Sequence, residues 1–237
     1  MNEQSELIQN SSTESISPYL QQLAGLYAEI FAAPPWNEVG KCPTCENFFP
    51  EKGGMCPNDN STIKEAYPLD STIEYIKEEL NKPLCFYVLS ISPKREPVSF
   101  GWGYACSIVE LVKAKYSQDE QVQAGAQDLL SQSLTLNPDS QVFYISEIGT
   151  APAWREKGLA SKLCRCLLAQ ANRLSLPVVT RTLVDSPSIY GIARNLRMKQ
   201  ISGCIRDSDE VIDGFDVINS RRVLFVSSNL FLFAKLL

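Results

Sequence analysis

The stretch Arg155-Glu-Lys-Gly158-Leu-Ala160 decides the fold of this 237-residue chain. An apolar, extended run at 142–148 precedes it, and a helix-like run at 159–174 follows it. The first backbone N–H groups of a helix have no partner within the helix, and the helix dipole favours an anion at that end. Gly158 has no Cβ, so a bulky ligand can approach the backbone there. A strand that turns through a basic, glycine-containing loop into a helix therefore predicts a phosphate-binding site.

The loop differs from the two best-known phosphate loops and resembles a third. A Walker loop needs a second glycine followed by Lys and Ser or Thr, whereas Leu159 follows Gly158 here, and the pattern G-x-G-x-x-G is not met either. Arg155-x-x-Gly158-x-Ala160 instead resembles the pyrophosphate loop of the GNAT family, the GCN5-related N-acetyltransferases, which reads Arg/Gln-x-x-Gly-x-Gly/Ala after a strand. The lead-in Thr150-Ala-Pro152-Ala-Trp154 is similar to theirs as well. An ordinary strand–turn–helix with a surface arginine is the alternative.

The resemblance implies an α/β (α+β) protein with the acyl-CoA N-acyltransferase fold, in which helices flank a mixed central sheet. It also implies acetyl-CoA as the co-substrate. Backbone groups of Ile148, Gly149 and Thr150 would then pair with the pantetheine arm as an added strand would. The N–H groups that would hold the pyrophosphate are those of Arg155, Glu156, Lys157, Gly158, Leu159 and Ala160.

Acetyl transfer to a primary amine requires a base, because an amine with a pKa near ~10 is protonated at neutral pH. The chain contains no histidine. Glu147 is the candidate, since many family members place an acidic residue near the end of this strand; a surface or ion-paired glutamate is the alternative. Family members often protonate the leaving thiolate with a tyrosine of the late helix, and Tyr190 is the candidate, with a packing tyrosine as the alternative. We expect direct attack in a ternary complex, with Cys106 and Cys164 as the alternatives for a covalent intermediate.

The late helix departs from the usual Y-x-x-L-G-F pattern of the family. With Leu196 as the leucine, Ala193 takes the tyrosine position and Arg197-Met198 replaces Gly-Phe. These departures favour a rival interpretation, a non-catalytic module that binds or senses acyl-CoA and uses its cysteine-rich loop for a protein partner. Glu147 favours the enzyme.

The predicted elements follow the family order over roughly residues 18–237. Polar residues 1–16 are expected to be a disordered tail, and residues 17–237 a single acetyltransferase domain. Ser17-Pro18 predicts a helix start, and Ser71-Thr-Ile-Glu74 predicts a capping box. Runs at 84–91 and 98–107 predict a hairpin, and a helical insertion is expected at 108–138. Further strands are expected at 177–183, 200–206 and 222–233, and a short helix at 188–198.

A cysteine-rich insertion at 40–60 contains two similar knuckles, Cys42-Pro-Thr-Cys45 and Cys56-Pro-Asn-Asp59. Paired cysteines at this spacing are typical of zinc sites, and aspartate is an allowed ligand. The insertion therefore predicts a structural zinc ion bound by Cys42, Cys45, Cys56 and Asp59. Three free thiols in a flexible loop are the alternative. The other cysteines lie in apolar runs and are expected in the core: Cys85, Cys106, Cys164, Cys166 and Cys204.

The net charge of −5 argues against a nucleic-acid partner, and so against a zinc-ribbon nucleic-acid protein. The N-terminus is polar and the apolar C-terminal run is short, which predicts a cytoplasmic protein without a membrane partner. The expected acceptor is an amine on a small molecule rather than on a protein. An acidic loop would either attract a cationic amine or be simply solvated; its residues are Asp207, Asp209, Glu210, Asp213 and Asp216.

Overall fold

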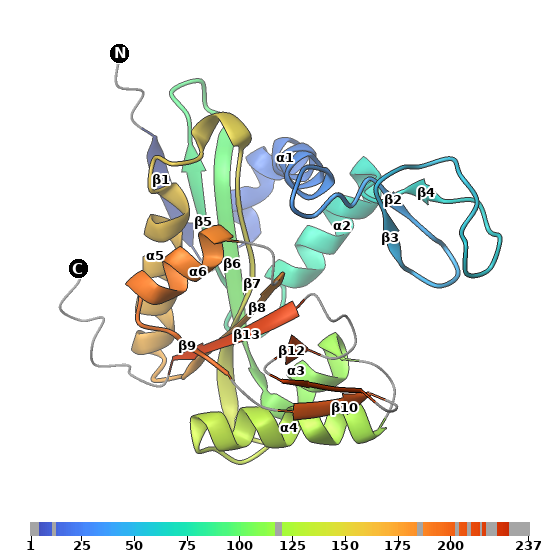
Figure 1. Ribbon diagram of the computed structural model, residues 1–237. Helices are drawn as coiled ribbons and strands as arrows, with labels where there is room; N and C mark the ends of the chain where they lie inside the picture. Colours follow the sequence, from blue (N-terminus) through green and yellow to red (C-terminus); the bar gives the residue numbers. More distant parts are fainter. Residues whose placement is uncertain are drawn as a thin grey trace.

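The computed structural model describes residues 5–10, 13–116, 120–183, 187–201, 204–207, 210–213, 215–216 and 222–227 (Figure 1). Its centre is an 8-stranded sheet in the order β1-β5-β6-β7-β8-β13-β12, with β9 paired to β13. The paired strands of this sheet are antiparallel except for β7 and β8, which run parallel. The mixed sheet flanked by helices confirms the predicted fold class.

The long central strands match the β-rich runs of the sequence. They are β5 (Phe86–Ile91), β6 (Pro97–Ser107), β7 (Gln141–Thr150) and β8 (Val178–Leu183). The large sheet also contains β1 (Glu6–Asn10), β9 (Lys199–Gln200), β12 (Phe215–Asp216) and β13 (Arg222–Ser227). Two small sheets consist of β10 (Cys204–Asp207) with β11 (Glu210–Asp213), and of β2 (Gly40–Lys41), β3 (Phe48–Phe49) and β4 (Lys64–Glu65).

Helices cover both faces of the large sheet, and each face has its own hydrophobic core. The first core includes buried residues of α1 (Leu20–Ala32), α2 (Leu69–Leu80), α3 (Ile108–Lys115) and α4 (Glu120–Leu134). The second includes buried residues of α5 (Leu159–Arg173) and α6 (Pro187–Asn195). Alternate residues of β5 serve the two cores, because Tyr87 and Leu89 belong to the first and Phe86 and Val88 to the second. Strand β7 therefore runs between two packed layers.

The N-terminal segment differs from the disordered tail expected over residues 1–16. Glu6–Asn10 forms β1 and pairs antiparallel with β5, and Thr13–Tyr19 forms a 3₁₀ helix. Leu7 packs against the second core and Ile8 against the first. A polar segment can form an edge strand because its backbone pairs with the N–H and C=O groups of β5 that face away from β6. The composition of the segment alone does not reveal this pairing.

Two predicted helix starts are wrong, and a third helix start was not predicted. α1 begins at Leu20 with Tyr19 as its N-cap, and Ser17 and Pro18 lie within the preceding 3₁₀ helix, so the expected start at Ser17-Pro18 does not form. α2 begins at Leu69 with Pro68 as its N-cap, so the expected capping box at Ser71 and Glu74 does not form. The Thr72 hydroxyl instead donates to the Pro68 carbonyl at 2.9 Å. A complete capping box occurs at Ser107 and Glu110, where β6 passes directly into α3.

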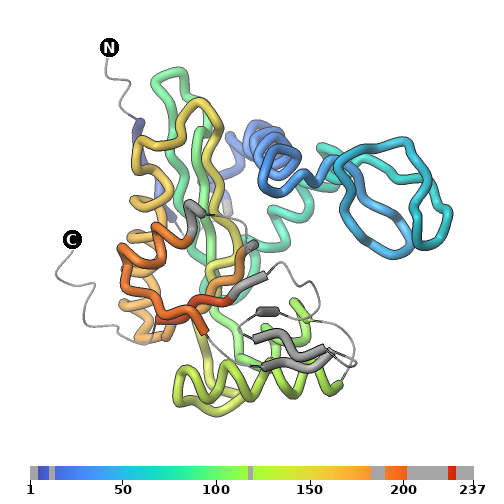
Figure 2. The backbone as a smooth tube through the Cα atoms, viewed as in Figure 1, coloured from blue at the N-terminus to red at the C-terminus, as the bar shows by residue number. Residues whose placement is uncertain are grey.

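The cysteine-rich module, defined here as residues 40–65, extends from the body beside α1 and α2 (Figure 2). It contains β2, β3 and β4 and has a small core of Cys42, Cys56 and Ile63. Within the described part of the chain, no helix is both long enough and apolar enough to cross a membrane.

Candidate active site

The predicted phosphate loop lies between β7 and α5 and lines a cavity. After β7, a short 3₁₀ helix (Pro152–Trp154) leads to Gly158, which is the N-cap of α5 with φ of +76°. This left-handed conformation is one that glycine adopts without strain. The cavity beside the loop has a volume of about 480 Å³. The first turn of α5 thus presents its free N–H groups next to a space large enough for a ligand.

The predicted cofactor residues come together around this cavity, with one exception. Its lining includes Ile148, Gly149, Thr150, Arg155, Glu156, Gly158, Leu159 and Ala160. Lys157 is not part of that lining, and its Nζ lies 4.3 Å from the centre of the Trp154 ring. Arg155 donates from Nε to the Thr150 carbonyl at 3.3 Å, which joins the end of β7 to the loop.

β7 has a backbone edge beside this cavity. Its pairing with β6 continues to Thr150, whereas its parallel ladder with β8 runs from Phe143–Val178 to Ile145–Thr180. Beyond Ile145 the two parallel strands separate, and Ile148, Gly149 and Thr150 line the cavity on the side that β8 has left. An extended ligand can therefore pair with this part of β7 as an added strand would.

A second cavity, of about 370 Å³, lies on the face covered by α1 and α2 and contains Glu147. The Glu147 carboxylate accepts hydrogen bonds at Oε1 from the Tyr75 hydroxyl at 3.0 Å and from the Tyr27 hydroxyl at 3.3 Å. Burial raises the pKa of both phenols, and the negative charge of Glu147 raises it further. Both tyrosines therefore stay protonated and act as donors to the carboxylate.

A β-bulge directs Glu147 to this face. The β6–β7 register shifts between Trp102 and Gly103, which pair with Glu147 and Ile145, so Ser146 is the extra residue. Consecutive residues normally point to opposite faces of a sheet, but Ser146 and Glu147 both bond to helices of the α1–α2 layer. The Ser146 hydroxyl donates to Glu79 of α2 at 2.6 Å. Sequence alternation gave no sign of this extra residue.

Aromatic and charged side chains from distant segments form the rest of the second cavity. Its aromatic lining consists of Tyr27, Phe31, Trp36, Phe48, Tyr67, Tyr75 and Tyr144. Its charged lining consists of Glu38, Lys41, Lys115, Glu147 and Arg181. Sequence reasoning missed these residues, apart from Glu147, because they are up to 154 positions apart along the chain, from Tyr27 to Arg181. Trp36 lines both cavities, which therefore lie side by side.

Tyr190 lies on α6 and is not among the residues that line either cavity. Its ring makes an edge contact with Phe225 of β13, with ring centres 5.3 Å apart. Ile192, two positions further on α6, lines the cavity beside the predicted phosphate loop. The described structure thus assigns Tyr190 a packing contact and places its helix beside the predicted cofactor site.

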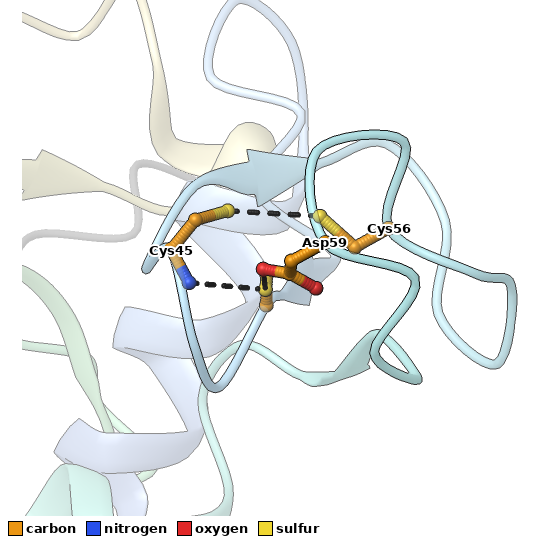
Figure 3. Close-up of side chains that lie close together, drawn as sticks. Cys45, Cys56 and Asp59 are labelled. Atoms are coloured by element: carbon orange, nitrogen blue, oxygen red, sulfur yellow. Dashed lines mark hydrogen bonds between the residues drawn. The ribbon is translucent and has the colours of Figure 1, made fainter.

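The predicted metal ligands also come together. One ligand atom from each of Cys42, Cys45, Cys56 and Asp59 lies within 4.8 Å of the others. Figure 3 shows Cys45, Cys56 and Asp59 converging, with the two sulfurs 3.6 Å apart. Backbone N–H groups of Thr44 and Cys45 point to the Cys42 sulfur at 3.4 and 3.3 Å. This donor set and spacing suit a tetrahedral zinc ion, whose bonds of about 2.0–2.3 Å place ligand atoms about 3–4 Å apart.

Of the other cysteines, Cys85, Cys106 and Cys164 are buried, and Cys166 is half-buried. Burial raises the pKa of Cys106 and of Cys164 to about 12. These thiols are therefore protonated near neutral pH and are poor nucleophiles. The side chains of Cys204 and of the acidic loop at 207–216 lie outside the described residues.

The fold occurs in solved structures of N-acetyltransferases. A variant of agmatine N-acetyltransferase in its apo form has a TM-score of 0.55 at 13% identity, covering 93% of this chain and 98% of that one. The polyamine N-acetyltransferase of Drosophila melanogaster has a TM-score of 0.54 at 12% identity, covering 94% and 99%. Arylalkylamine N-acetyltransferase 2 of Aedes aegypti has a TM-score of 0.51 at 13% identity, covering 93% and 97%.

The sequence itself matches no protein-family model. It also matches no curated protein sequence. The likeness is therefore one of fold, and it extends over nearly the whole chain. The order of strands, the separation of β7 from β8 and the glycine-capped α5 agree with that likeness. On this evidence the chain has the fold of the GNAT N-acetyltransferases, as its pyrophosphate-loop pattern predicted.

Proposed function

We propose that the protein is an N-acetyltransferase that moves an acetyl group from acetyl-CoA to a primary amine by direct attack in a ternary complex. The observation that carries this proposal is the position of two adjacent residues of β7. Glu147 lines one cavity and Ile148 lines the other. An amine bound beside Glu147 and a thioester bound along the edge of β7 would meet at one point of the strand.

In this proposal the cofactor lies in the larger cavity. The pantetheine arm pairs with the backbone of Ile148, Gly149 and Thr150, and the pyrophosphate binds the N–H groups of residues 155–160. The glycine-capped start of α5 supports the second contact, because a helix N-terminus attracts anions. Arg155, which lines the cavity, adds a positive charge to the same region.

Glu147 is the proposed general base. It takes a proton from the bound ammonium group, and the neutral nitrogen then attacks the carbonyl carbon of the thioester. The C–N bond forms and the nitrogen releases its remaining extra proton to solvent, while the C–S bond breaks and the sulfur leaves as a thiolate. The phenol hydroxyls of Tyr27 and Tyr75 keep the carboxylate directed into the cavity by their hydrogen bonds to Oε1.

The departing thiolate needs a proton, and Tyr190 is the residue we propose to supply it. Its helix lies beside the cofactor cavity through Ile192. A neutral phenol hydroxyl can donate its proton to a departing thiolate as a general acid. The hydroxyl would have to turn toward the cofactor sulfur while the ring keeps its contact with Phe225.

The proposed acceptor is a small cationic amine. A cavity of about 370 Å³ suits a small molecule. Aromatic faces and carboxylates attract an ammonium group, and the cavity offers Glu38 and Glu147 among seven aromatic residues, beside the three cations Lys41, Lys115 and Arg181. Tyramine and agmatine are suitable probes, because they test an aromatic and a guanidinium tail on the same kind of amine.

We also propose that Cys42, Cys45, Cys56 and Asp59 bind a structural zinc ion, since three thiols and a carboxylate converge there. A zinc–thiolate site is compatible with the reducing cytoplasm, which is the location we propose. Protein purified without chelator should contain one equivalent of zinc by atomic spectroscopy. A zinc content near zero would contradict this part of the proposal.

The alternative function is a non-catalytic module that binds acyl-CoA. It is favoured by Ala193, which is buried on α6 where the family pattern carries its tyrosine. Turnover separates the two functions. Release of CoA, together with mass-spectrometric detection of acetylated tyramine or agmatine, is the result that the enzyme predicts. Acetyl-CoA binding without acetylation of any amine in a broad panel would favour the module.

A further inference from the structure

The cysteine-rich module provides part of the proposed acceptor cavity. Lys41 of β2 and Phe48 of β3 line that cavity, and so do Glu38 and Ala66, which flank the module. Lys41 is followed directly by Cys42, the first predicted zinc ligand. The ligand cluster and the cavity wall are therefore built on the same three short strands, β3-β2-β4.

The two knuckles lie in the two loops that connect these strands. Cys42 and Cys45 lie between β2 and β3, and Cys56 and Asp59 lie between β3 and β4. The central strand β2 pairs through Lys41 with Phe48 on one side and with Lys64 on the other. An ion bound by both loops would thus fix the position of β2 and β3 relative to each other.

The hydrophobic core of the module is very small. It consists of two cysteines and Ile63, with Cys45 and Phe49 packed beside them. Two of the three buried members are proposed zinc ligands, so binding of the ion replaces the hydrophobic core that so small a sheet lacks. Phe48 is 42% exposed, so burial alone does not fix its orientation.

Hydrogen bonds and a ring contact connect the module to other residues of the cavity lining. The Val39 N–H donates to the Phe49 carbonyl at 3.0 Å, and the Glu38 N–H donates to the Phe31 carbonyl of α1 at 2.9 Å. The Phe48 ring stacks on Tyr67 with centres 5.8 Å apart. Tyr67 in turn donates its hydroxyl to Glu38. Movement of β2 or β3 would therefore shift the Phe48 ring and the Glu38 carboxylate of the proposed acceptor cavity together.

We propose that the zinc ion positions the wall of the acceptor cavity formed by Glu38, Lys41, Phe48 and Tyr67, so that zinc occupancy sets the affinity for the amine and leaves acetyl-CoA binding unchanged. This inference rests on the acetyltransferase function proposed above. The cofactor cavity supports the separation, because its lining contains no residue of the module. Metal binding is here a positioning function, and the ion takes no part in the acetyl transfer.

The test compares Cys56→Ser with a matched cysteine variant, Cys166→Ser. Cys166 is half-buried on α5, outside the module and outside the lining of both cavities. Calorimetric titration of tyramine and agmatine into CoA-saturated protein measures acceptor affinity without turnover. We expect Cys56→Ser to lose its zinc and to bind the amine at least about tenfold more weakly, with acetyl-CoA affinity within about twofold of wild type. Cys166→Ser should change none of these quantities.

A second variant, Phe48→Ala, distinguishes the effect of the cavity wall from the effect of the zinc ion. It should keep a full equivalent of zinc and still bind the amine more weakly. Unchanged acetyl-CoA affinity in both variants shows that they are folded. An amine affinity that survives loss of zinc would overturn the inference, and so would protein that carries a Cys45–Cys56 disulfide in place of zinc.

Failure of the proposed function gives a different pattern. If wild-type protein binds acetyl-CoA and zinc but neither acetylates nor binds an amine, the enzyme proposal fails. Hydrogen–deuterium exchange then decides the positioning claim without any amine. Faster exchange at residues 38–49 in Cys56→Ser, with residues 155–165 unchanged, would support it. Equal exchange in both proteins would overturn it.

Discussion

Glu147 is held by two phenol hydroxyls at the end of a bulged strand, and this arrangement gives the proposed base its direction. Glu147→Gln keeps the shape and still accepts both hydrogen bonds, but it cannot take a proton. We expect kcat near neutral pH to fall by about 10²-fold, the usual contribution of general-base catalysis. Acetyl-CoA affinity should change by less than about twofold. Steady-state kinetics with a direct binding titration measures both.

Glu74→Gln is the matched control, because Glu74 lies on the same helix as Tyr75 and pairs with Lys77 at the surface. Its kcat should equal that of wild type. A Glu147→Gln enzyme with full activity and an unchanged pH–rate profile would exclude Glu147 as the base.

Tyr75 gives the account a pH-dependent prediction. Its pKa is raised by burial and by Glu147, so it stays protonated and donates to the carboxylate at 3.0 Å. A hydrogen bond to a carboxylate favours the charged form, which is the form that can act as a base. In Tyr75→Phe that form should therefore appear at higher pH, and the acidic limb of the kcat/KM profile should move upward.

The control is Tyr104→Phe, since Tyr104 accepts a hydrogen bond from Lys82 and does not line the acceptor cavity. Its acidic limb should stay in place. If the limb in Tyr75→Phe also stayed in place, the phenol would have no part in setting the protonation of the base.

At the scale of single elements, α6 contributes Tyr190, the proposed proton donor to the thiolate. Tyr190 contacts Phe225 edge-on, and Tyr190→Phe keeps that ring contact while it removes the hydroxyl. If Tyr190 protonates the thiolate, kcat should fall by about tenfold or more while acetyl-CoA affinity stays within about twofold of that of wild type. Rapid kinetics and a direct binding titration of the same preparation measure the two quantities. Full activity would exclude Tyr190 as the proton donor.

The elements show how far sequence reasoning reaches. Local apolar runs predicted β5, β6, β7, β8 and α5, because each of them contributes buried residues to the two cores. Features that depend on a partner strand were missed, namely the pairing of β1 and the extra residue Ser146 in β7. An unpaired edge and a register shift leave no periodic signal in the chain itself.

The candidate sites show the same contrast between local patterns and features that depend on distant segments. The loop at 155–160 and the ligand set of the cysteine-rich module are local patterns, and both were found in the sequence. The proposed acceptor cavity combines α1, the module, α2, α3, β7 and β8, so its lining could not be read from any single stretch. Tyr27 and Tyr75 occupy helix positions that look like ordinary core positions in the sequence. Only the fold shows that their hydroxyls donate hydrogen bonds to Glu147.

At the scale of the whole molecule, two cavities lie side by side along β7, the proposed acceptor cavity and the proposed cofactor cavity. α1, α2 and the cysteine-rich module border the cavity that contains Glu147. α5 and α6 border the cavity of the phosphate loop, together with Ile30, Pro35 and Trp36. β7 contributes to both. This arrangement predicts that substitutions in the module act on the amine, and that substitutions in the loop act on acetyl-CoA.

The claim on which the account depends is that the β7–α5 loop binds acetyl-CoA. The direct measurement is the thermal shift of wild type and of Gly158→Glu with acetyl-CoA, with free CoA and with neither. A ligand at a concentration about 100-fold above its Kd stabilises the folded state by about 2.7 kcal/mol, or about 5–10 °C for a chain of this size. Gly53→Glu is the matched control, because Gly53 has φ of +87° and as much open space as Gly158 but lies in the cysteine-rich module.

The account predicts that acetyl-CoA raises the melting temperature of wild type and of Gly53→Glu by the same amount, and leaves that of Gly158→Glu unchanged. A wild-type protein that shows no shift at millimolar acetyl-CoA, or a Gly158→Glu protein that shifts as much as wild type, would contradict it.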